Sequence, residues 1–361
     1  MTTAFLFLAG LAALVAGAEL LVRGAGKLAV SFGISPLVVG LTAVALGTSA
    51  PELVVSVQSV WSGRVDLAVG NVVGSNIFNV LFILGLAAAI APLVVSRQVI
   101  RQEVPVMVGV SVLAMAFARD GEIGRLEAGA LFGLFAAYTA FLVVQSRRER
   151  AGDAAAEVAA QVGAGSRWDG HWAAQAGLVA AGLVLLVAGS DWLVGAAVAF
   201  ARAMGISELV IGLTIVAAGT SAPEVATSVL ATIRGEREIA VGNVIGSNTF
   251  NLLGVLGVSG LIAPQALGGA PSLVTFDIPV MVAVSLACLP IFFTGHAIAR
   301  WEGLVFLAYY AAYAAFLVLA ARQHDALPAF SSALMLFVLP LTALTLAILA
   351  WRARAARGAG T

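Results

Sequence analysis

Residues 33–92 read GISPLVVGLTAVALGTSAPELVVSVQSVWSGRVDLAVGNVVGSNIFNVLFILGLAAAIAP, and residues 205–264 read GISELVIGLTIVAAGTSAPEVATSVLATIRGEREIAVGNVIGSNTFNLLGVLGVSGLIAP. The two stretches align without a gap at a constant offset of 172, and 35 of the 60 positions are identical. The identities include Thr, Ser, Asn, Glu and Pro, so an apolar composition alone does not explain them. The chain therefore contains an internal repeat.

Composition indicates the class of protein. Of the 361 residues, 61% are hydrophobic and only 11% are charged, whereas a soluble domain carries roughly 25% charged residues. Apolar runs of about twenty residues recur along the chain, and such runs span a bilayer core. These features exclude a soluble enzyme, a disordered chain and a disulfide-stapled protein. Because the net charge is zero and the single cysteine, Cys288, lies in an apolar run, we expect neither a nucleic-acid partner nor a cysteine-based metal site.

Polar breaks between the apolar runs predict an all-α membrane protein with eleven spanning helices. The first run resembles a secretory signal, but no basic residue precedes it and a near copy of its end recurs at 188–194, so we expect a retained helix. The predicted spans lie near residues 3–30, 34–60, 67–91, 102–118, 125–145, 173–203, 206–232, 239–262, 274–294, 301–320 and 328–351.

These spans suggest a division of the chain into four parts. Residues 1–145 would form a first five-helix repeat, and residues 173–320 a second, inverted one. The polar stretch at 146–172 reads as a linker too short to fold alone, and residues 321–361 as an extra span with a tail. Arginine and lysine fall 14 to 5 on alternate sides. The positive-inside rule then predicts a cell (inner) membrane protein with its N-terminus outside and its linker and C-terminus in the cytoplasm.

The number of intervening spans predicts how the two copies are related. Five spans separate the start of one copy from the start of the other, and five is odd, so the copies cross the membrane in opposite directions. Inverted repeats with interrupted helices are a transporter architecture whose binding site lies near the bilayer midplane. We therefore expect the functional residues within the repeated segments.

The repeated GTSAPE segment carries the candidate site. Pro51 and Pro223 lack an N–H, so each should bend its helix and free the carbonyl four residues earlier, which at membrane depth must face protein, water or an ion. The first copy supplies Thr48, Glu52 and Ser56 on one helical face, and Ser75 and Asn79 on the next helix. Ser49 and Ser221 lie in the motif itself. The corresponding groups of the second copy are Thr220, Glu224, Ser247 and Asn251.

The chemistry of these groups restricts the ligand. They are carboxylate, hydroxyl, amide and carbonyl oxygens, and the three histidines lie in predicted loops or at helix ends. Oxygen-only sites suit hard cations such as Na⁺, Ca²⁺ or Mg²⁺ and disfavour Zn²⁺ or copper. Two carboxylates balance one Ca²⁺ or two Na⁺, so occupancy by the two ions should be mutually exclusive and antiport follows.

Structural interpretations of the same residues stay open. Glu52 and Glu224 could be protonated and tie helices together, although a mid-bilayer acid costs ~2.5–3.5 kcal/mol on insertion scales. The hydroxyls could satisfy freed backbone groups. Asn71 and Asn243 could cap or brace helix starts, Glu19 could pair with Arg23, and Tyr138 and Tyr313 read as packing aromatics. Gly70, Gly74, Gly242 and Gly246 form GxxxG pairs, which predict close helix packing.

The paired motifs GTSAPE…GNVVGSNIFN and GTSAPE…GNVIGSNTFN resemble those of the cation/calcium antiporter superfamily, specifically its prokaryotic sodium/calcium exchangers. The resemblance covers ten of the eleven spans. It implies two inverted halves, ion sites between the second, third, seventh and eighth helices, and alternating access by sliding of the first and sixth. By position it implies a ligand set of Glu52, Glu224, Thr48, Thr220, Ser49, Ser221, Ser75, Ser247, Asn79 and carbonyls near Ala45 and Ala217.

Two features depart from that family pattern. Members often carry an acid where this chain has Asn251, so ion stoichiometry and potassium dependence do not follow from the resemblance. The span at 328–351 lies beyond the family's ten helices. The short linker has no room for the calcium-sensing domains of animal relatives.

The same residues are also compatible with other transport functions. H⁺/Ca²⁺ exchange is possible because a buried glutamate with a raised pKa can carry a proton, and oxygen ligands also admit Mn²⁺ or Mg²⁺. A passive cation channel is a further alternative. No HExxH motif is present and no membrane-embedded histidine could activate the serines, so we expect no enzyme, no cofactor and no protein partner, only lipid and small cations.

Overall fold

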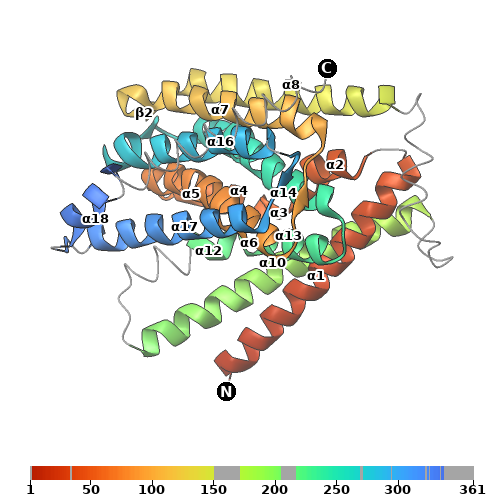
Figure 1. Ribbon diagram of the computed structural model, residues 1–361. Helices are drawn as coiled ribbons and strands as arrows, with labels where there is room; N and C mark the ends of the chain where they lie inside the picture. The colour runs from red at the N-terminus through yellow and green to blue at the C-terminus, as the bar shows by residue number, and fades with distance from the viewer. Residues whose placement is uncertain are drawn as a thin grey trace.

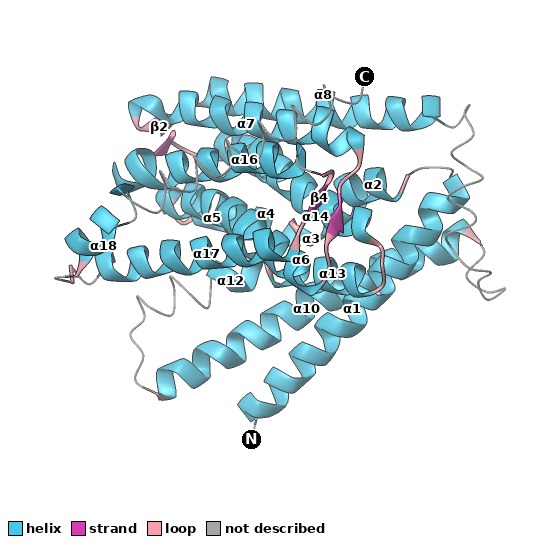
Figure 2. Ribbon diagram, viewed as in Figure 1, coloured by secondary structure: helices cyan, strands magenta, loops and turns pink. Residues whose placement is uncertain are grey.

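The computed structural model describes residues 2–32, 35–149, 171–204, 217–268, 271–293, 295–321, 323–324, 326–333 and 335–336. Most of the expected linker, the first half of the expected span at 206–232 and most of the expected span at 328–351 lie outside these residues. The described chain is almost entirely helical (Figure 2).

The elements of the first half follow in chain order, where η marks a π-helical turn except for η4, a 3₁₀ turn. They are α1 (Thr2–Phe32), α2 (Pro36–Val39), η1 (Gly40–Val44), α3 (Ala45–Thr48), α4 (Ala50–Trp61), α5 (Val65–Phe78), η2 (Asn79–Leu84), α6 (Gly85–Ile90), β1 (Leu93–Val94), η3 (Val99–Glu103), α7 (Val104–Phe117), η4 (Ala118–Asp120), β2 (Glu122–Ile123) and α8 (Arg125–Glu149).

The described elements of the second half repeat this order. They are α10 (Trp172–Ala203), α12 (Ala217–Thr220), α13 (Ala222–Ile233), α14 (Arg237–Phe250), η7 (Asn251–Val255), α15 (Leu256–Ile262), β3 (Leu267–Gly268), η8 (Leu273–Asp277), α16 (Ile278–Phe293), β4 (Ala297–Ile298) and α17 (Arg300–Ala321), followed by α18 (Leu327–Ala333).

Long apolar helices dominate the described residues. Eight of them are long and apolar enough to cross a membrane, and the bent pair Leu37–Thr48 and Ala50–Trp61 makes up to nine. Ala222–Ile233 is a shorter apolar helix in the described part of the expected span at 206–232. The eight lie at Thr3–Ala29, Val65–Ile90, Val99–Asp120, Arg125–Gln145, Trp172–Phe200, Arg237–Ile262, Leu273–Phe293 and Arg300–Ala320.

The helix interruption expected at Pro51 is confirmed. α3 ends at Thr48, α4 begins at Ala50 with Pro51 in its first turn, and the two segments meet at an angle of 42°. The second copy has the same break, because α12 ends at Thr220 and α13 begins at Ala222. Proline is tolerated in the first turn of a helix, where an N–H has no intrahelical partner in any case.

α1 and α10 pack side by side and cross the rest of the bundle obliquely (Figure 1). Glycines allow the close approach. A Cβ placed on Gly10 would lie 2.8 Å from the carbonyl oxygen of Gly189, and one on Gly17 would lie 2.8 Å from that of Gly182. Contacts of this kind between small residues are how helices associate in membranes. They come in repeat-related pairs, since Gly10 corresponds to Gly182 and Gly17 to Gly189.

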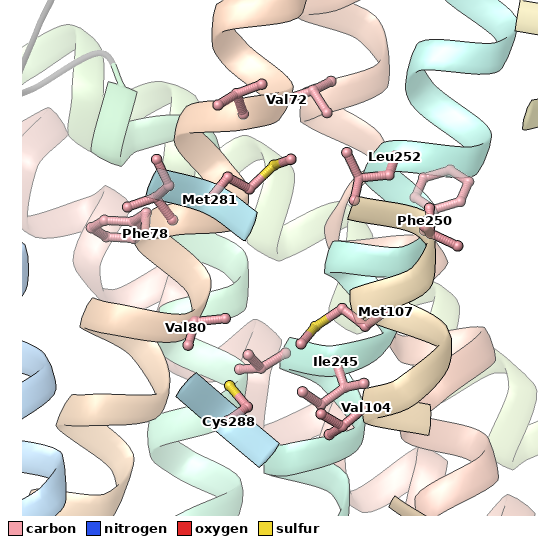
Figure 3. Close-up of a cluster of buried hydrophobic side chains, with 14 of the residues drawn as sticks. Val72, Phe78, Val80, Val104, Met107, Ile245, Phe250, Leu252, Met281 and Cys288 are labelled. Carbon is pink, nitrogen blue, oxygen red and sulfur yellow. The ribbon is translucent and has the colours of Figure 1, made fainter. Parts of the chain in front are cut away.

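The hydrophobic core shows the relative direction of the two repeats. The spans Val65–Ile90 and Arg237–Ile262 are the most buried candidates in the described chain. In Figure 3, Val72 lies above Val80, whereas Leu252 lies above Ile245. The two repeat-related spans therefore run in opposite directions at their contact, as the inverted repeat predicts.

Contacts at the ends of the spans are also reciprocal. β1 pairs antiparallel with β4, and β2 with β3, so each half supplies one strand to each two-stranded ribbon. Arg125 Nη2 donates to the carbonyl oxygen of Ala263 at 2.8 Å, and Arg300 Nη2 donates to that of Ile90 at 3.1 Å. Such exchange of equivalent contacts is what a twofold relation between the halves produces.

Ser111 and Ser285 mark where the twofold relation passes through the core. Each hydroxyl donates to the carbonyl four residues earlier, in Met107 and Met281. The two hydroxyl oxygens lie 3.3 Å apart. A residue that touches its own counterpart lies on the axis that relates the two halves.

Candidate functional site

The two GTSAPE breaks meet in the centre of the bundle. Ser49 and Ser221 occupy the N-cap positions of α4 and α13, where a serine hydroxyl ordinarily accepts a bond from its own helix. Neither does so. Ser49 Oγ donates instead to Glu224 Oε1 at 2.9 Å, and Ser221 Oγ donates to Glu52 Oε1 at 2.8 Å. Each glutamate is thus bound by the serine of the other repeat.

Both carboxylates are enclosed by protein. The exposed fraction is 1% for Glu52 and 0% for Glu224, and each lies in the first turn of its helix, where the helix dipole favours negative charge. The hydroxyls of Thr220 and Thr48 approach Glu52 and Glu224 respectively. Within the described chain, the Oε2 atom of each carboxylate has no hydrogen-bond partner.

Four asparagines form a layer across the contact between the repeats. Asn76 Nδ2 donates to the carbonyl oxygen of Asn248 at 3.2 Å, and Asn248 Nδ2 donates to that of Asn76 at 3.3 Å. Asn79 Nδ2 donates to Asn248 Oδ1 at 2.9 Å, and Asn251 Nδ2 donates to Asn76 Oδ1 at 3.2 Å. Because the amide nitrogens are held in this way, the buried Oδ1 atoms of Asn79 and Asn251 are left without a partner among the described residues.

Asn71 and Asn243 brace the glutamate helices. Asn71 Nδ2 donates to Ser56 Oγ at 3.0 Å and to the carbonyl oxygen of Glu52 at 3.2 Å. Asn243 Nδ2 makes the corresponding bonds to Ser228 Oγ at 3.0 Å and to Glu224 at 3.5 Å. The bracing role left open by the sequence is therefore observed, although these asparagines were not expected so close to the carboxylates.

Ser190 of α10 was not anticipated from the sequence. Its hydroxyl donates to the carbonyl oxygen of Gly219 at 2.6 Å, which is the carbonyl that Pro223 was expected to free. The signal was present in the near copies AGAELLV at 16–22 and AGSDWLV at 188–194, where a serine replaces an alanine.

The remaining expected site residues lie around this centre. Ser75 Oγ lies 3.4 Å from Ser221 Oγ, and the buried Ser247 Oγ has no partner in the described chain. The carbonyl oxygen of Ala45 accepts the Ser49 N–H at 3.0 Å. Ala217 begins α12, and its side chain is outside the described set.

The GxxxG glycines and Glu19, for which the sequence suggested structural roles, have the following contacts. Gly242 and Gly246 pack closely on α2 and η1, since a Cβ on Gly242 would lie 2.8 Å from the carbonyl oxygen of Leu37 and one on Gly246 would lie 2.7 Å from that of Leu41. Gly70 and Gly74 show no close packing in the described chain: a Cβ on Gly70 would lie 3.8 Å from Leu273 Cδ1, and one on Gly74 would meet no atom within 4 Å. Glu19, for which Arg23 was the expected partner, forms an ion pair with Arg234.

The two tyrosines do more than pack. Tyr138 donates its hydroxyl to Glu103 Oε2 at 2.6 Å, and Tyr313 donates its hydroxyl to Asp277 Oδ1 at 2.8 Å. The two bonds join equivalent places in the halves. Neither belongs to the glutamate centre.

The donor atoms determine what the centre can hold. They are oxygens of carboxylates, amides and hydroxyls, and no group of three or more His, Cys, Asp or Glu residues suited to a metal occurs in the described ranges. A hard cation is the ligand that fits such atoms. A buried oxygen centre between broken, inverted helices defines the class of the molecule, a secondary transporter for small cations.

Comparison with known proteins agrees with that class. The sodium/calcium exchanger protein family matches residues 2–144 and 174–319. The chain belongs to that family and is therefore a membrane antiporter of the cation/Ca²⁺ type.

Individual relatives cover most of the chain. The putative antiporter CaxA of Alkalimonas amylolytica is 40% identical over 67% of this chain and 74% of its own. The sodium/calcium exchanger MaX1 of Methanosarcina acetivorans is 35% identical over 73% and 84%. A solved structure of the sodium-calcium exchanger NCX_Mj superposes with a TM-score of 0.73 at 30% identity, covering 86% of this chain and 97% of that one.

Proposed function

We propose that the protein exchanges Ca²⁺ for Na⁺ by alternating access, with the ions bound at the centre between the two repeats. The observation that carries the proposal is a set of buried oxygens left without hydrogen-bond partners in the described chain. They occur as repeat-related pairs, the Oε2 atoms of Glu52 and Glu224 and the Oδ1 atoms of Asn79 and Asn251. A buried polar atom without a partner costs about 1–3 kcal/mol, so four together favour a bound cation.

The proposed ligands extend outward from these four residues. Hydroxyls of Thr48, Thr220, Ser49, Ser221, Ser75 and Ser247 and carbonyls near Ala45 and Ala217 would complete the shell. Ca²⁺ takes six to eight oxygens, which this set supplies. The serine hydroxyls donate to Glu52 Oε1 and Glu224 Oε1, which leaves the Oε2 atom of each carboxylate for a cation.

Charge explains why the transport would be an exchange. The two glutamates together carry the charge that balances one Ca²⁺ or two Na⁺, and a centre filled by one ion type has no charge left for the other. Release of one ion then requires binding of its competitor. In this interpretation no cofactor takes part, and Ca²⁺ and Na⁺ are the cargo.

The arrangement in the membrane is part of the proposal. Residues 1–145 and 173–320 would be the inverted halves, joined by the linker at 146–172, with an extra helix and tail at 321–361. The family match to 2–144 and 174–319 supports these limits. The distribution of basic residues supports an N-terminus outside and a cytoplasmic C-terminus in the cell membrane.

Isotope flux in proteoliposomes tests the coupling. Vesicles loaded with Na⁺ and diluted into Na⁺-free medium should accumulate ⁴⁵Ca²⁺, and empty vesicles or vesicles containing Glu52→Gln should not. Wild-type ⁴⁵Ca²⁺ uptake that is the same with and without the Na⁺ gradient would reject sodium coupling.

The same vesicles separate the rivals. Uptake driven by a pH gradient without Na⁺ would identify H⁺/Ca²⁺ exchange. Flux that follows the electrochemical gradient of Ca²⁺ without any counter-ion would identify a passive channel. Competition of ⁴⁵Ca²⁺ uptake by Mn²⁺ and Mg²⁺ then defines selectivity.

A further inference from the structure

A cavity of about 220 Å³ lies at one end of the bundle, away from the glutamate centre. It is lined by Arg97, Ile100, Arg101, Phe293 and His296. Its volume is far above the roughly 10–15 Å³ that a single water molecule needs by this measure. The lining combines cationic side chains with an apolar wall.

The two arginines present their charges together. Arg101 lies in η3 and Arg97 lies four residues earlier, so the side chains share one helical face. Both are exposed, and neither forms an ion pair with an acidic side chain in the part of the chain described. Paired guanidinium groups are well suited to a phosphate, because each can donate two parallel hydrogen bonds to its oxygens.

His296 is held beside them by the backbone. Its φ angle is +55°, an uncommon value for a residue other than glycine. The N–H of Val95 donates to its carbonyl oxygen at 2.8 Å, next to the pairing of β1 with β4. A left-handed residue that is held in place by its neighbours is strained, and such residues cluster at ligand-binding sites.

The basic lining belongs to one half of the molecule only. In the other half η8 corresponds to η3, and the positions equivalent to Arg97 and Arg101 are Pro271 and Thr275. The twofold relation that explains so many contacts therefore does not require this charge. A function specific to one face of the membrane explains the two arginines better than the twofold relation does.

The depth of the cavity restricts its occupant. The candidate span Val99–Asp120 begins beside Arg97, and the span Leu273–Phe293 ends at the cavity wall. This is the level at which lipid headgroups meet the hydrocarbon core. A ligand here can place a phosphate against the arginines and an acyl chain against Ile100 and Phe293.

We propose that this cavity binds the phosphate group of an anionic phospholipid, on the cytoplasmic face in the orientation given above. Basic pockets between membrane helices on that side recognise anionic headgroups. The inference does not depend on which ion drives transport.

Native mass spectrometry of the purified, detergent-solubilised full-length protein tests the proposal. Phosphatidylglycerol is titrated against the wild type and against the double variant Arg97→Gln/Arg101→Gln. Each arginine near an anionic lipid strengthens binding by roughly fivefold, so the apparent Kd should rise about 25-fold. The variant Arg97→Lys/Arg101→Lys keeps the charge but loses the bidentate geometry, so its apparent Kd should lie between those of the wild type and the double glutamine variant.

A matched variant controls for the loss of charge. Arg64→Gln/Arg119→Gln removes two exposed arginines that the proposed orientation places on the opposite face, and it should retain wild-type affinity. Equal lipid binding by the Arg97/Arg101 variant and the wild type, or an equal loss in the control, would overturn the site. Displacement of the lipid by inorganic phosphate alone would overturn the lipid as the occupant in favour of a soluble phosphate compound.

Discussion

The two copies of GTSAPE, at 47–52 and 219–224, are identical in sequence and are held differently. At the second copy, Ser190 of α10 donates to the freed carbonyl of Gly219. At the position of α1 that corresponds to Ser190 the chain has Ala18, which has no hydroxyl to donate. The motif is thus symmetric where it meets the centre and asymmetric where it meets the oblique helices.

The ion pair between Glu19 and Arg234 shows the same contrast. It ties α1 to the end of α13. The corresponding residues in the other half are Asp191 and Ser62, which cannot form an ion pair with each other. If the halves were identical, exchanging their conformations would give two states of equal free energy. Contacts present in only one half remove that equality, so in the proposed alternating-access cycle we expect the inward-open and outward-open states to differ in stability.

The largest effect is expected from neutralising either glutamate, and the two variants should be equally impaired if the centre is functionally as symmetric as its contacts. Glu52→Gln and Glu224→Gln each remove one buried charge while keeping the side-chain shape. Loss of one member of a buried charged set costs about 3–5 kcal/mol, so Ca²⁺ exchange should fall at least about 100-fold in both. The measurement is Na⁺-dependent ⁴⁵Ca²⁺ uptake, with exposed Glu122→Gln as the control. Exchange retained in either variant would contradict the site.

A second test makes the asparagine layer asymmetric. Asn251→Asp adds a negative charge to the asparagine layer of the proposed site, so the number of Na⁺ or H⁺ exchanged per Ca²⁺, or the pH dependence of uptake, should change. Asn79→Asp is the repeat-related control and should change coupling in the same sense. Parallel ²²Na⁺ and ⁴⁵Ca²⁺ fluxes measure the ratio. A coupling ratio unaffected by Asn251→Asp would remove that position from the ligand set.

A third test concerns the packing of the two breaks on α10. A Cβ on Gly47 would lie 2.4 Å from Leu183 Cδ2, and one on Gly219 would lie 2.2 Å from Val194 Cγ2. Overpacking of this kind costs about 1–3 kcal/mol, so both alanine variants should unfold at lower temperature. Gly133→Ala, which meets no atom within 4 Å in the described chain, is the control. Thermal stability equal to that of the wild type would show that the side chains of α10 move to accommodate the added methyl groups.

Ser190→Ala probes the asymmetric support directly. It leaves the buried carbonyl of Gly219 without its donor, and hydrogen bonds between membrane helices contribute about 0.6 kcal/mol on average and about 1.7 at most. Thermal unfolding in detergent should reveal a loss in this range. Ala18→Ser is the matched variant, because it offers the first repeat an equivalent hydroxyl. Ser190→Ala without any loss would mean that the bond does not stabilise the break.

Arg234→Gln should have the smallest effect. The pair with Glu19 is partly exposed, so its loss should cost less than about 1 kcal/mol and less still at high salt. Arg64→Gln is the charge-matched control. An effect on thermal stability that does not diminish with salt would contradict a screened surface pair.

The same substitution has a consequence for pH dependence. Burial raises the pKa of Glu236 above its ordinary value of 4.5, and Arg234 opposes that rise. The folded state therefore holds the proton more tightly than the unfolded state, and stability falls as pH rises from 4.5 through the raised pKa. Without Arg234 the pKa rises further, so the fall should become larger. Unfolding temperatures across that interval measure it.

The sequence predicted the fold where its signals were local or repeated. The repeat, the apolar runs and Pro51 were sufficient for the inverted halves, the long helices and the break. Partners far apart in sequence were not predictable, because no periodicity places Arg234 beside Glu19 or Asn76 beside Asn248. The two glutamates could be singled out in the sequence because an acid is costly in a membrane, and their role as ligands stays a prediction. Asn71 and Ser190 were missed as contributors because their polar groups also serve ordinary helix packing.

Because of the crossed bonds from Ser49 to Glu224 and from Ser221 to Glu52, neither half contains the whole proposed binding site. A change in the relative placement of the two motifs would separate each acid from the hydroxyl that orients it. In the proposed site, cargo affinity therefore depends on the relative placement of the halves, and a substitution in one copy of the motif would alter the acid of the other copy.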